Sequence, residues 1–375
     1  MPVNWRLLSD SKVLPDSGLA LDDALTRSAS EWGSPTLRLY TYTPCVLVGR
    51  FQHVPNEVNL EHCQSMGVPI NRRPSGGGAI IMGPDQLGIA LIIPNRIDGF
   101  AMRSSDLMHQ CASGLIRALE KLGISAKFQG KNDLVADNRK IAGLGLYQPN
   151  SSGRLFHASL LLDLNIKTML KLLRAPFDST EASTNRYSAV SKRITTVRSS
   201  VGTDFSMSEL IETVRAGYED EFGVRIESQK VNSSEQQLAD HLVETQYSTT
   251  EWIYRDNAPV RDYVGQSSIR TGAGDLEIKV ITAGDTLKSV FLSGNFITSD
   301  NAVHDLESSL RWHTSEPRAL KQTIAKSMKQ NAKAWDRISE GEITTTLLRA
   351  LNQSDTSNSN LTAGSCFGRE IAEVV

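Results

Sequence analysis

The strongest constraint on the fold is the alternation of short apolar runs with helical segments. Runs rich in β-branched and apolar residues fall at 37–49, 68–71, 78–82, 87–93 and 158–163. Runs of this length and composition predict strands. Residues 106–122 and 208–222 instead repeat apolar side chains every three or four positions and are followed by glycine, which predicts amphipathic helices. The chain is therefore expected to adopt an α+β fold, a mixed β-sheet flanked by helices.

A second, smaller domain is expected in the last third of the chain, because 375 residues exceed one average domain. Residues 276–280 and 287–296 alternate with period 2 around an Ala-Gly-Asp turn at 283–285, which predicts a hairpin. Helices are expected around 301–312, 317–329 and 340–351. Polar residues rise between 228 and 250, and the junction is placed near 245–250. The predicted division is 1–246 for the large domain, 247–352 for a small α/β domain, and 353–375 for a polar linker and tail.

Composition and charge exclude several classes of protein. The net charge of −2 and the pI of about 6.4 leave no overall basic surface for nucleic acid. No apolar run approaches the roughly 20 residues that span a bilayer, and the start lacks the pattern of a secretory signal, so we expect a cytoplasmic protein without membrane segments. Four cysteines without a C-x-x-C pair predict neither a zinc site nor a disulfide framework.

Two segments carry the chemistry. Residues 72–80 read Arg-Arg-Pro-Ser-Gly-Gly-Gly-Ala-Ile, and residues 131–143 bring Lys140 just before Ile-Ala-Gly. Glycine lets the backbone approach a ligand and offer its N–H groups to an anion. The spacing is neither that of a P-loop nor that of a Rossmann turn. By residue type alone, the triple glycine also fits a flexible turn and Lys140 a solvated turn lysine. The pattern favours an anion site for a carboxylate and a phosphate together.

These segments resemble the catalytic domain of the lipoate–protein ligase A family. Residues 72–79 match its Arg-Arg-x-Ser-Gly-Gly-Gly-Ala loop, and residues 132–143 match its Asn-Asp-Leu…Arg-Lys-Ile-x-Gly segment. Further matches follow the order of the family at 46–52, 156–162 and 194–201. The layout after residue 247 is similar to the family's small C-terminal accessory domain, including a Trp-x-Tyr entry. The resemblance implies a biotin/lipoate ligase-like fold.

The resemblance also implies an activity. Lipoic acid and ATP with Mg²⁺ would give lipoyl-AMP, and a lysine of a lipoyl-domain acceptor would then be acylated. Lys140 would be catalytic, bridging the carboxylate and the α-phosphate, with Asn132 and Asp133 contacting the nucleotide and Asp133 binding Mg²⁺. The implied substrate contacts are Gly49, Arg50, Arg72, Ser75, Gly76, Gly77, Gly78, Ala79, Gly143, His157 and Ser159. By residue type, Asn132 and Asp133 also fit a turn, and His157 a structural strand residue without a catalytic role.

The expected partner is a lipoyl-domain acceptor protein, namely a dehydrogenase E2 subunit, the glycine cleavage H protein or a specialised lipoate-binding protein. The enzyme itself is expected to be a monomer. Residue types and resemblance leave open which acceptor is used, and whether the acid is lipoate or octanoate.

The chain departs from the family pattern in one place. Where the glycine loop usually continues into His-Asp, this chain has Met82 and Gly83. Three alternatives remain open. A branch of the family transfers acyl groups through a cysteine just before the Asn-Asp-Leu segment, but residues 126–131 contain none, which disfavours a thioester route. An ATP-independent lipoyl or octanoyl amidotransferase and a non-catalytic lipoyl-domain binding protein are the other two.

Overall fold

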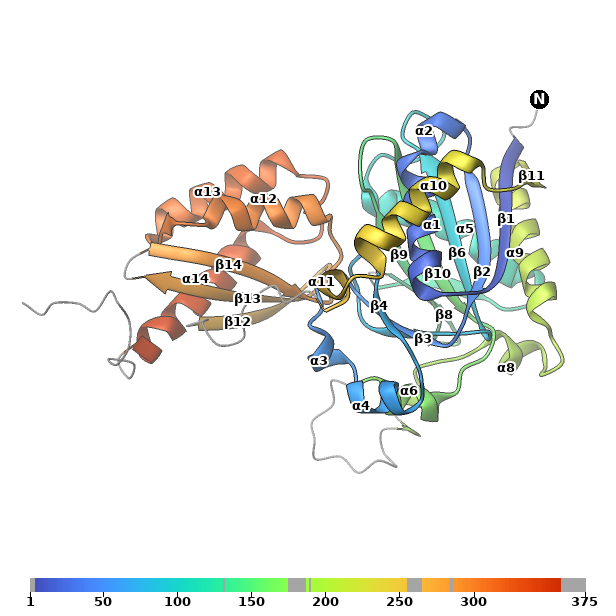
Figure 1. Cartoon of the computed structure of the whole chain (residues 1–375), viewed down its shortest axis with the longest axis horizontal. Helices are drawn as coiled ribbons and strands as arrows, with labels where there is room; N and C mark the ends of the chain where they lie inside the picture. The colour runs from blue at the N-terminus through green and yellow to red at the C-terminus, as the bar shows by residue number, and fades with distance from the viewer. Residues whose placement is uncertain are drawn as a thin grey trace, which may run out of the picture. The chain divides into compact units, whose positions relative to one another are not determined.

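The computed structural model describes residues 4–130, 132–174, 187–188, 190–254, 265–283 and 286–358. The chain divides into two compact units, residues 1–255 and 256–375 (Figure 1). The assignment of 1–246 as a catalytic domain and 247–352 as an accessory domain stays a prediction.

The first unit is built on an eight-stranded mixed sheet in the order β11-β1-β2-β6-β10-β9-β8-β7. β1 is parallel to β11 and to β2, and every other neighbouring pair is antiparallel. The strands are β1 (Asn4–Val13), β2 (Thr36–Tyr42), β6 (Gln86–Pro94), β7 (Ala126–Gln129), β8 (Asp133–Ala136), β9 (Arg139–Tyr147), β10 (Gly153–Leu161) and β11 (Arg225–Ser228). The expected α+β class with a mixed sheet is confirmed.

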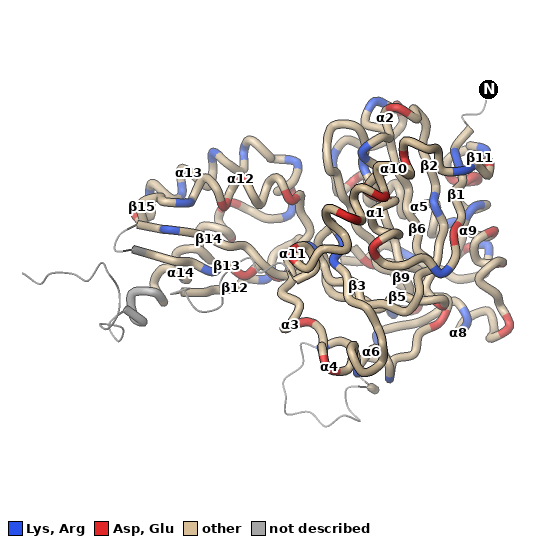
Figure 2. Tube along the Cα trace, in the orientation of Figure 1, with Lys and Arg blue, Asp and Glu red and all other residues tan. Residues whose placement is uncertain are grey.

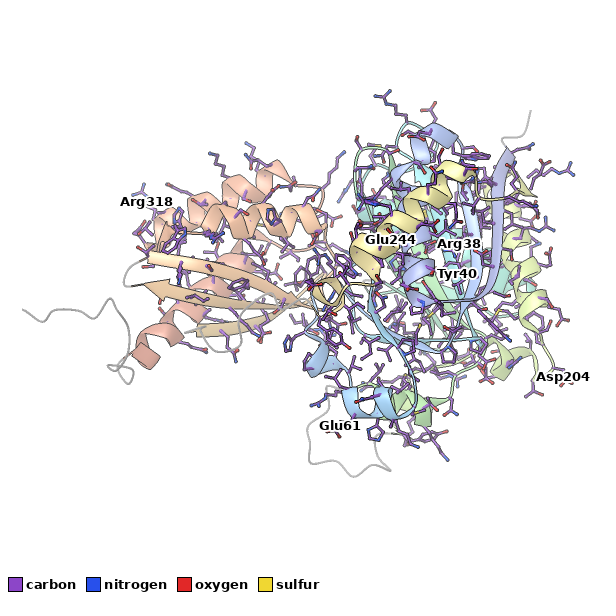
Figure 3. All side chains as sticks on the ribbon, viewed as in Figure 1. Arg38, Tyr40, Glu61, Asp204, Glu244 and Arg318 are labelled. Atoms are coloured by element: carbon purple, nitrogen blue, oxygen red, sulfur yellow. The ribbon has the colours of Figure 1, made fainter. Side chains whose placement is uncertain are left out.

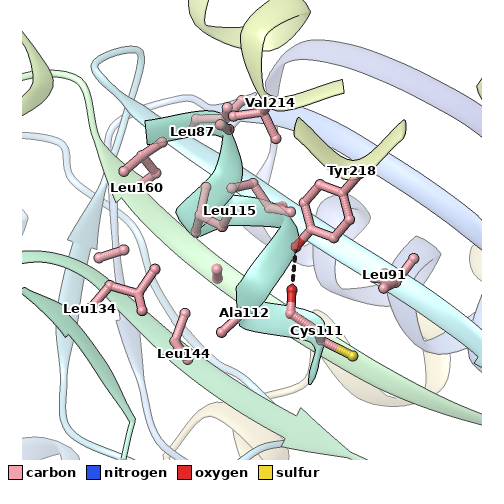
Figure 4. Close-up of a cluster of buried hydrophobic side chains, with 14 of the residues drawn as sticks. Leu87, Leu91, Cys111, Ala112, Leu115, Leu134, Leu144, Leu160, Val214 and Tyr218 are labelled. Carbon is pink, nitrogen blue, oxygen red and sulfur yellow. Dashed lines mark hydrogen bonds between the residues drawn. The ribbon is translucent and has the colours of Figure 1, made fainter. Parts of the chain in front are cut away.

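One face of this sheet is covered by α5 (Ser104–Lys121) and α9 (Met207–Phe222), which pack against each other. Both helices were expected from their periodicity. Figure 4 shows their core, where the Tyr218 hydroxyl donates to the Cys111 carbonyl at 3.0 Å. A Cβ on Gly114 would lie 2.6 Å from the Tyr218 ring, so the glycine lets this ring lie flat on α5. Cys111 is buried, on the apolar side of α5.

The other face of the sheet carries α1 (Pro15–Arg27), with α10 (Ser233–Leu242) packed against it. A second sheet lies on this side, in the order β4-β3-β5, and comprises β3 (Cys45–Val48), β4 (Ile70–Arg72) and β5 (Ile80–Met82). The apolar run at 37–49 was expected as one strand, but it is divided between β2 and β3. Pro44 lies at the break, where it supplies no N–H for a ladder.

Short helices connect these elements. They are α2 (Ala29–Trp32), α3 (Val54–Glu57), α4 (Leu60–Ser65), α6 (Ile166–Leu172), α8 (Val197–Val201), the π-helical turn η1 (Val243–Tyr247) and α11 (Thr250–Ile253). The expected Trp-x-Tyr entry to the second domain lies in and directly after α11, within the first unit.

The second unit contains a four-stranded antiparallel sheet in the order β12-β13-β14-β15. Its elements are β12 (Gly265–Thr271), β13 (Gly274–Ala283), β14 (Thr286–Gly294), α12 (Asp300–Leu310), β15 (His313–Thr314), α13 (Pro317–Gln330) and α14 (Glu340–Asn358). The predicted hairpin is formed by β13 and β14, and its turn residues 284 and 285 lie outside the described residues. The three predicted helices are present, and α14 continues into the stretch predicted as a linker.

Acidic and basic residues are interspersed along the trace of both units (Figure 2). In the described ranges, no helix has both the length and the apolar character needed to cross a membrane.

Candidate functional site

A cavity of about 140 Å³ lies on the α1 face of the eight-stranded sheet. Its base is a lateral row of residues in register: Gly143 on β9 faces Ser159 on β10, which faces Gly88 on β6, which faces Tyr40 on β2. All four line the cavity. Strands are about 4.8 Å apart, so the row spans roughly 14 Å. Gly143 and Ser159 are small and leave room above β9 and β10, whereas the Tyr40 ring lies over Gly88, where a Cβ would come within 2.7 Å of it.

Apolar side chains form much of the cavity wall. They come from α1, from the second sheet and the residue before β5, and from β10, and are Leu19, Leu47, Ala79, Ile80, Met82 and Leu155. Met82 therefore lies in the wall at the position where the resemblance led us to expect histidine. A narrow apolar groove of this kind suits an extended aliphatic chain.

Lys140 lies at the β9 end of the row. Its ammonium Nζ is 2.7 Å from Asp133 Oδ1, and both side chains are 37% exposed. The Lys140 backbone is fixed on both sides, because its N–H donates to the Arg193 carbonyl and its carbonyl accepts from Thr195 N–H. A Cβ on Gly143 would lie 3.3 Å from Nζ, so the glycine makes room for the lysine stem.

Arg73 places a second cation in the cavity wall. Its guanidinium donates to the carbonyls of Leu47 (3.1 Å), Gly76 (3.1 Å) and Gly78 (2.6 Å). The residue is only 7% exposed, and no carboxylate in the described part of the chain pairs with it. Burial lowers the pKa of Arg73 to about 10, so it remains charged at neutral pH. A buried charge without a counter-ion is costly, and an anionic ligand in the cavity would supply one.

The glycine loop is packed closely against the loop that follows β3. A Cβ on Gly49 would lie 1.9 Å from the Gly77 carbonyl oxygen, so only glycine fits at position 49. Gly77 itself has φ of +96°, in the region that favours glycine. The Arg50 N–H donates to the Ser75 carbonyl at 2.9 Å, which joins the two loops.

Ser75 and His157 form a hydrogen-bonded pair in the cavity wall, with 2.6 Å between Oγ and Nε2. The ring of His157 lies over Gly145, where a Cβ would come within 2.3 Å of Nε2. Burial, together with the charge of Arg73, lowers the pKa of His157 to about 3. The imidazole is therefore neutral at physiological pH and too weak a base to deprotonate the serine. It is suited to orienting the Ser75 hydroxyl.

Arg72 is absent from the cavity wall, although the sequence singled it out as a substrate contact. Its Nη1 donates to the carbonyls of Gly49, Arg50 and Gln52 at 2.7–3.0 Å. Its Nε donates to the carbonyls of Trp252 (2.9 Å) and Ile253 (3.1 Å) in α11. The Trp252 indole N–H donates back to the Arg72 carbonyl at 2.8 Å. Arg72 thus fastens the loop beneath the glycine loop to α11.

The predicted site residues as a whole divide into two groups. Those that line the cavity are Ser75, Gly78, Ala79, Asn132, Lys140, Gly143, His157 and Ser159. Those outside its lining are Gly49, Arg50, Arg72, Gly76, Gly77 and Asp133, although Asp133 pairs with Lys140. Asn132 is held by two hydrogen bonds to the backbone of Leu144. The substrate-contact, nucleotide and metal roles given to these residues stay predictions.

The list of predicted site residues left out Arg73, although this residue flanks the glycine loop, and it missed the far end of the cavity. At that end Asp22 accepts from Arg38 Nη1 (2.7 Å) and from the Tyr40 hydroxyl (2.6 Å). Arg38 also pairs with Asp10 at 2.8 Å, and burial raises the pKa of Asp22. Arg38 and Tyr40 lie in the interior on β2 (Figure 3). The Asp22 carboxylate is thus engaged by Arg38 and Tyr40. Of the two cations at the other end of the cavity, Lys140 is paired with Asp133, and Arg73 has no carboxylate partner among the described residues.

The donor set of the site suits a magnesium ion carried by a nucleotide better than a metal held by protein alone. Within the described ranges, no group of three or more histidine, cysteine, aspartate or glutamate side chains could hold a metal ion. Magnesium usually binds one or two carboxylates together with substrate phosphates, and Asp133 offers one carboxylate beside Lys140. Cys45, Cys63 and Cys111 are buried and none of them lines the cavity.

Comparison with known proteins assigns the first unit to a protein family. The model of a family described as the lipoyl protein ligase A/B catalytic domain matches residues 15–219. A curated relative, the octanoyltransferase LipM of Carboxydothermus hydrogenoformans, is 24% identical over 271 residues, which cover 67% of this chain and 98% of the relative.

Solved structures share the fold. LipL1 of P. falciparum, in complex with lipoate, matches with a TM-score of 0.68 and 16% identity, covering 92% of this chain and 99% of that one. A bipartite lipoate protein ligase from Thermoplasma acidophilum, described with its E2 lipoyl domain, matches with a TM-score of 0.61 and 23% identity, covering 69% of this chain and 99% of that one.

Proposed function

Because this chain belongs to the lipoyl protein ligase A/B catalytic-domain family, we propose that it attaches a lipoyl or octanoyl group to a lysine of an acceptor protein. The observation that carries this proposal is the cavity itself. An apolar groove over a row of small residues ends at Arg73, a buried cation without a carboxylate partner among the described residues, and at Lys140. A medium-chain carboxylic acid matches both parts, the chain in the groove and the carboxylate beside the cations.

Within this activity, we propose that the enzyme is an ATP-dependent ligase that forms an acyl-adenylate. The acid's carboxylate oxygen forms a bond to the α-phosphorus of ATP, and the bond to pyrophosphate breaks. The amine of the acceptor lysine then forms an amide with the acyl carbon, and AMP leaves. Carboxylate and phosphate repel each other, so the first step needs fixed positive groups around both.

The residues of the chain take complementary parts in this scheme. Lys140 is a compact charge on a long stem, suited to reach the carboxylate and the α-phosphate together. Arg73 is held rigidly by three carbonyls and offers a fixed charge. Ser75, oriented by neutral His157, presents a hydroxyl to an oxygen of the acid. Magnesium, bound with the nucleotide beside Asp133, would neutralise part of the phosphate charge.

A second candidate is an octanoyltransferase that needs no ATP, and it is favoured by the relationship to LipM proteins. A covalent thioester route would need a reactive cysteine at the acyl group. In the described part of the chain no cysteine lines the cavity, and burial raises the pKa of Cys45 to about 12, which keeps it a thiol. These observations favour the ligase.

The acceptor is proposed to be a lipoyl domain, as in the Thermoplasma system named above. A cytoplasmic location and a monomeric state stay predictions.

An acid-dependent exchange of labelled pyrophosphate into ATP tests the ligase directly. The full-length protein should catalyse exchange with lipoate or octanoate, and a Lys140→Ala variant should not. Absence of exchange, combined with transfer of an octanoyl group from a carrier protein, would establish the second candidate instead.

A further inference from the structure

We propose that Asp133 is a competing counter-ion for Lys140, which weakens acid binding until another cation engages the Asp133 carboxylate. The inference rests on the proposed function, because it concerns an acid bound in the same cavity. It assigns to Asp133 a coupling role between the acid and the metal–nucleotide, beyond that of a nucleotide contact.

The geometry of the hairpin formed by β8 and β9 brings the two side chains together. Asp133 lies opposite Gly143, and the register shifts between Leu134 and Val135, so that Val135 faces Lys140. Gly143, without a side chain, leaves the space through which the Lys140 stem reaches back to Asp133. The resulting distance of 2.7 Å is that of a close ion pair.

Arg73 and Lys140 therefore differ in whether a protein carboxylate already compensates their charge, and so in how strongly they attract a substrate anion. Arg73 makes its hydrogen bonds to neutral carbonyls, so its positive charge is not cancelled by a protein carboxylate within the described ranges. Lys140 is already neutralised by Asp133. A substrate carboxylate that reaches Lys140 comes within a few ångströms of the Asp133 carboxylate. The resulting repulsion opposes acid binding whether or not the ion pair breaks.

Both side chains are partly exposed, so the opposing energy is that of a solvent-screened pair. Measured values for such pairs correspond to a change of about two- to fivefold in a binding constant. A divalent cation that binds the Asp133 carboxylate removes this opposition. Because coupling between two ligands is reciprocal, the metal–nucleotide should then strengthen binding of the acid, and the acid should strengthen binding of the metal–nucleotide.

Calorimetric titration of the full-length protein with octanoate, without metal or nucleotide, tests the first part. The Asp133→Asn variant, which lacks the charge, should bind octanoate about two- to fivefold more tightly than wild type. Asp133→Glu, which keeps the charge, should bind it weakly, like wild type. Asp137→Asn is the matched control, because Asp137 is an exposed residue in the turn of the same hairpin, outside the cavity. It should leave the affinity unchanged.

The second part is tested by repeating the titrations with Mg²⁺ and a non-hydrolysable ATP analogue. Wild type should then bind octanoate more tightly, and Asp133→Asn should show no such gain. Equal or weaker octanoate binding by Asp133→Asn, with an unfolding temperature equal to that of wild type, would overturn the coupling role and leave the proposed function intact. Failure of wild type to bind octanoate or lipoate under any of these conditions would instead count against the proposed function.

Discussion

Replacing Gly49 with alanine should disable the site, although position 49 does not line the cavity. The added Cβ would lie 1.9 Å from the Gly77 carbonyl oxygen and 3.4 Å from Arg73 Nη2. To reach ordinary contact distance, the Gly77 carbonyl must retreat by roughly 1.5 Å. The backbone of Gly49 does not have a positive φ, so the alanine causes no strain of its own. The displacement must therefore be taken up by the glycine loop.

The size of the effect follows from that displacement. A shift of about 1 Å in groups that position a substrate can cost roughly 100-fold in rate. Overpacking of this kind costs about 1–3 kcal/mol of folding free energy. We therefore expect kcat/KM for acylation of a lipoyl domain to fall by about 100-fold, with a moderate fall in the unfolding temperature.

The assay is acceptor acylation followed by intact-protein mass spectrometry, together with thermal unfolding. Gly83→Ala is the matched control, because a Cβ there meets its nearest atoms at 3.4 Å and 3.7 Å, ordinary contact distances. It should retain activity within a few-fold of wild type. If Gly49→Ala has the kcat/KM of Gly83→Ala, the argument that the two loops support each other is refuted.

Three further predictions follow from the site. Lys140→Met should reduce acid-dependent pyrophosphate exchange by at least about 100-fold without changing the unfolding temperature, because it removes the charge but keeps the stem; exchange near the wild-type rate would contradict its role. Arg73→Met should weaken octanoate binding in calorimetry and also lower stability, because three carbonyls lose their donor; tighter binding would refute its assignment as the anion-facing cation. The pKa of His157 is lowered from 6.5 to about 3 in the folded protein. Between these pH values the unfolded chain binds more protons than the folded protein, so the free energy of unfolding should fall as the pH falls. His157→Gln should flatten this dependence in urea unfolding at pH 7.5 and 5; an identical slope would contradict the assignment.

Much of the first unit could be predicted from periodicity, but its first strand could not. The segments of β6 and β10 are apolar runs, and α5 and α9 repeat apolar side chains every three or four residues. The secondary structure of each could therefore be predicted from its local sequence. β1 contains Arg6, which is buried and pairs with Glu235 at 2.7 Å. An arginine within a short apolar run indicates a surface segment rather than a buried strand, unless the carboxylate that pairs with it from elsewhere in the sequence is known. The four-residue strands β7, β8 and β11 were also missed, since each is short and β7 and β11 are largely exposed. The sequence analysis did not predict β9 as a strand either.

The same limit applies to the site. Motif order led to Ser75, Lys140 and His157, all of which line one cavity. It did not distinguish Arg72 from Arg73, because two adjacent residues of an extended chain point to opposite sides and only the fold decides which side faces the ligand. Asp22 was missed because it comes from α1, far from any motif, and its partners are brought together only by the packing of α1 on the sheet.

The fastening of Arg72 to α11 determines where this protein can be shortened. A polar stretch ending near residue 250 suggests a convenient place to cut, but a fragment ending at 246 would lose the Trp252 and Ile253 carbonyls that accept from Arg72 Nε. Leaving a buried donor unsatisfied costs about 1–3 kcal/mol. That is a large part of the free energy of unfolding of a typical domain. Recombinant versions of the first unit should therefore extend at least to Tyr254.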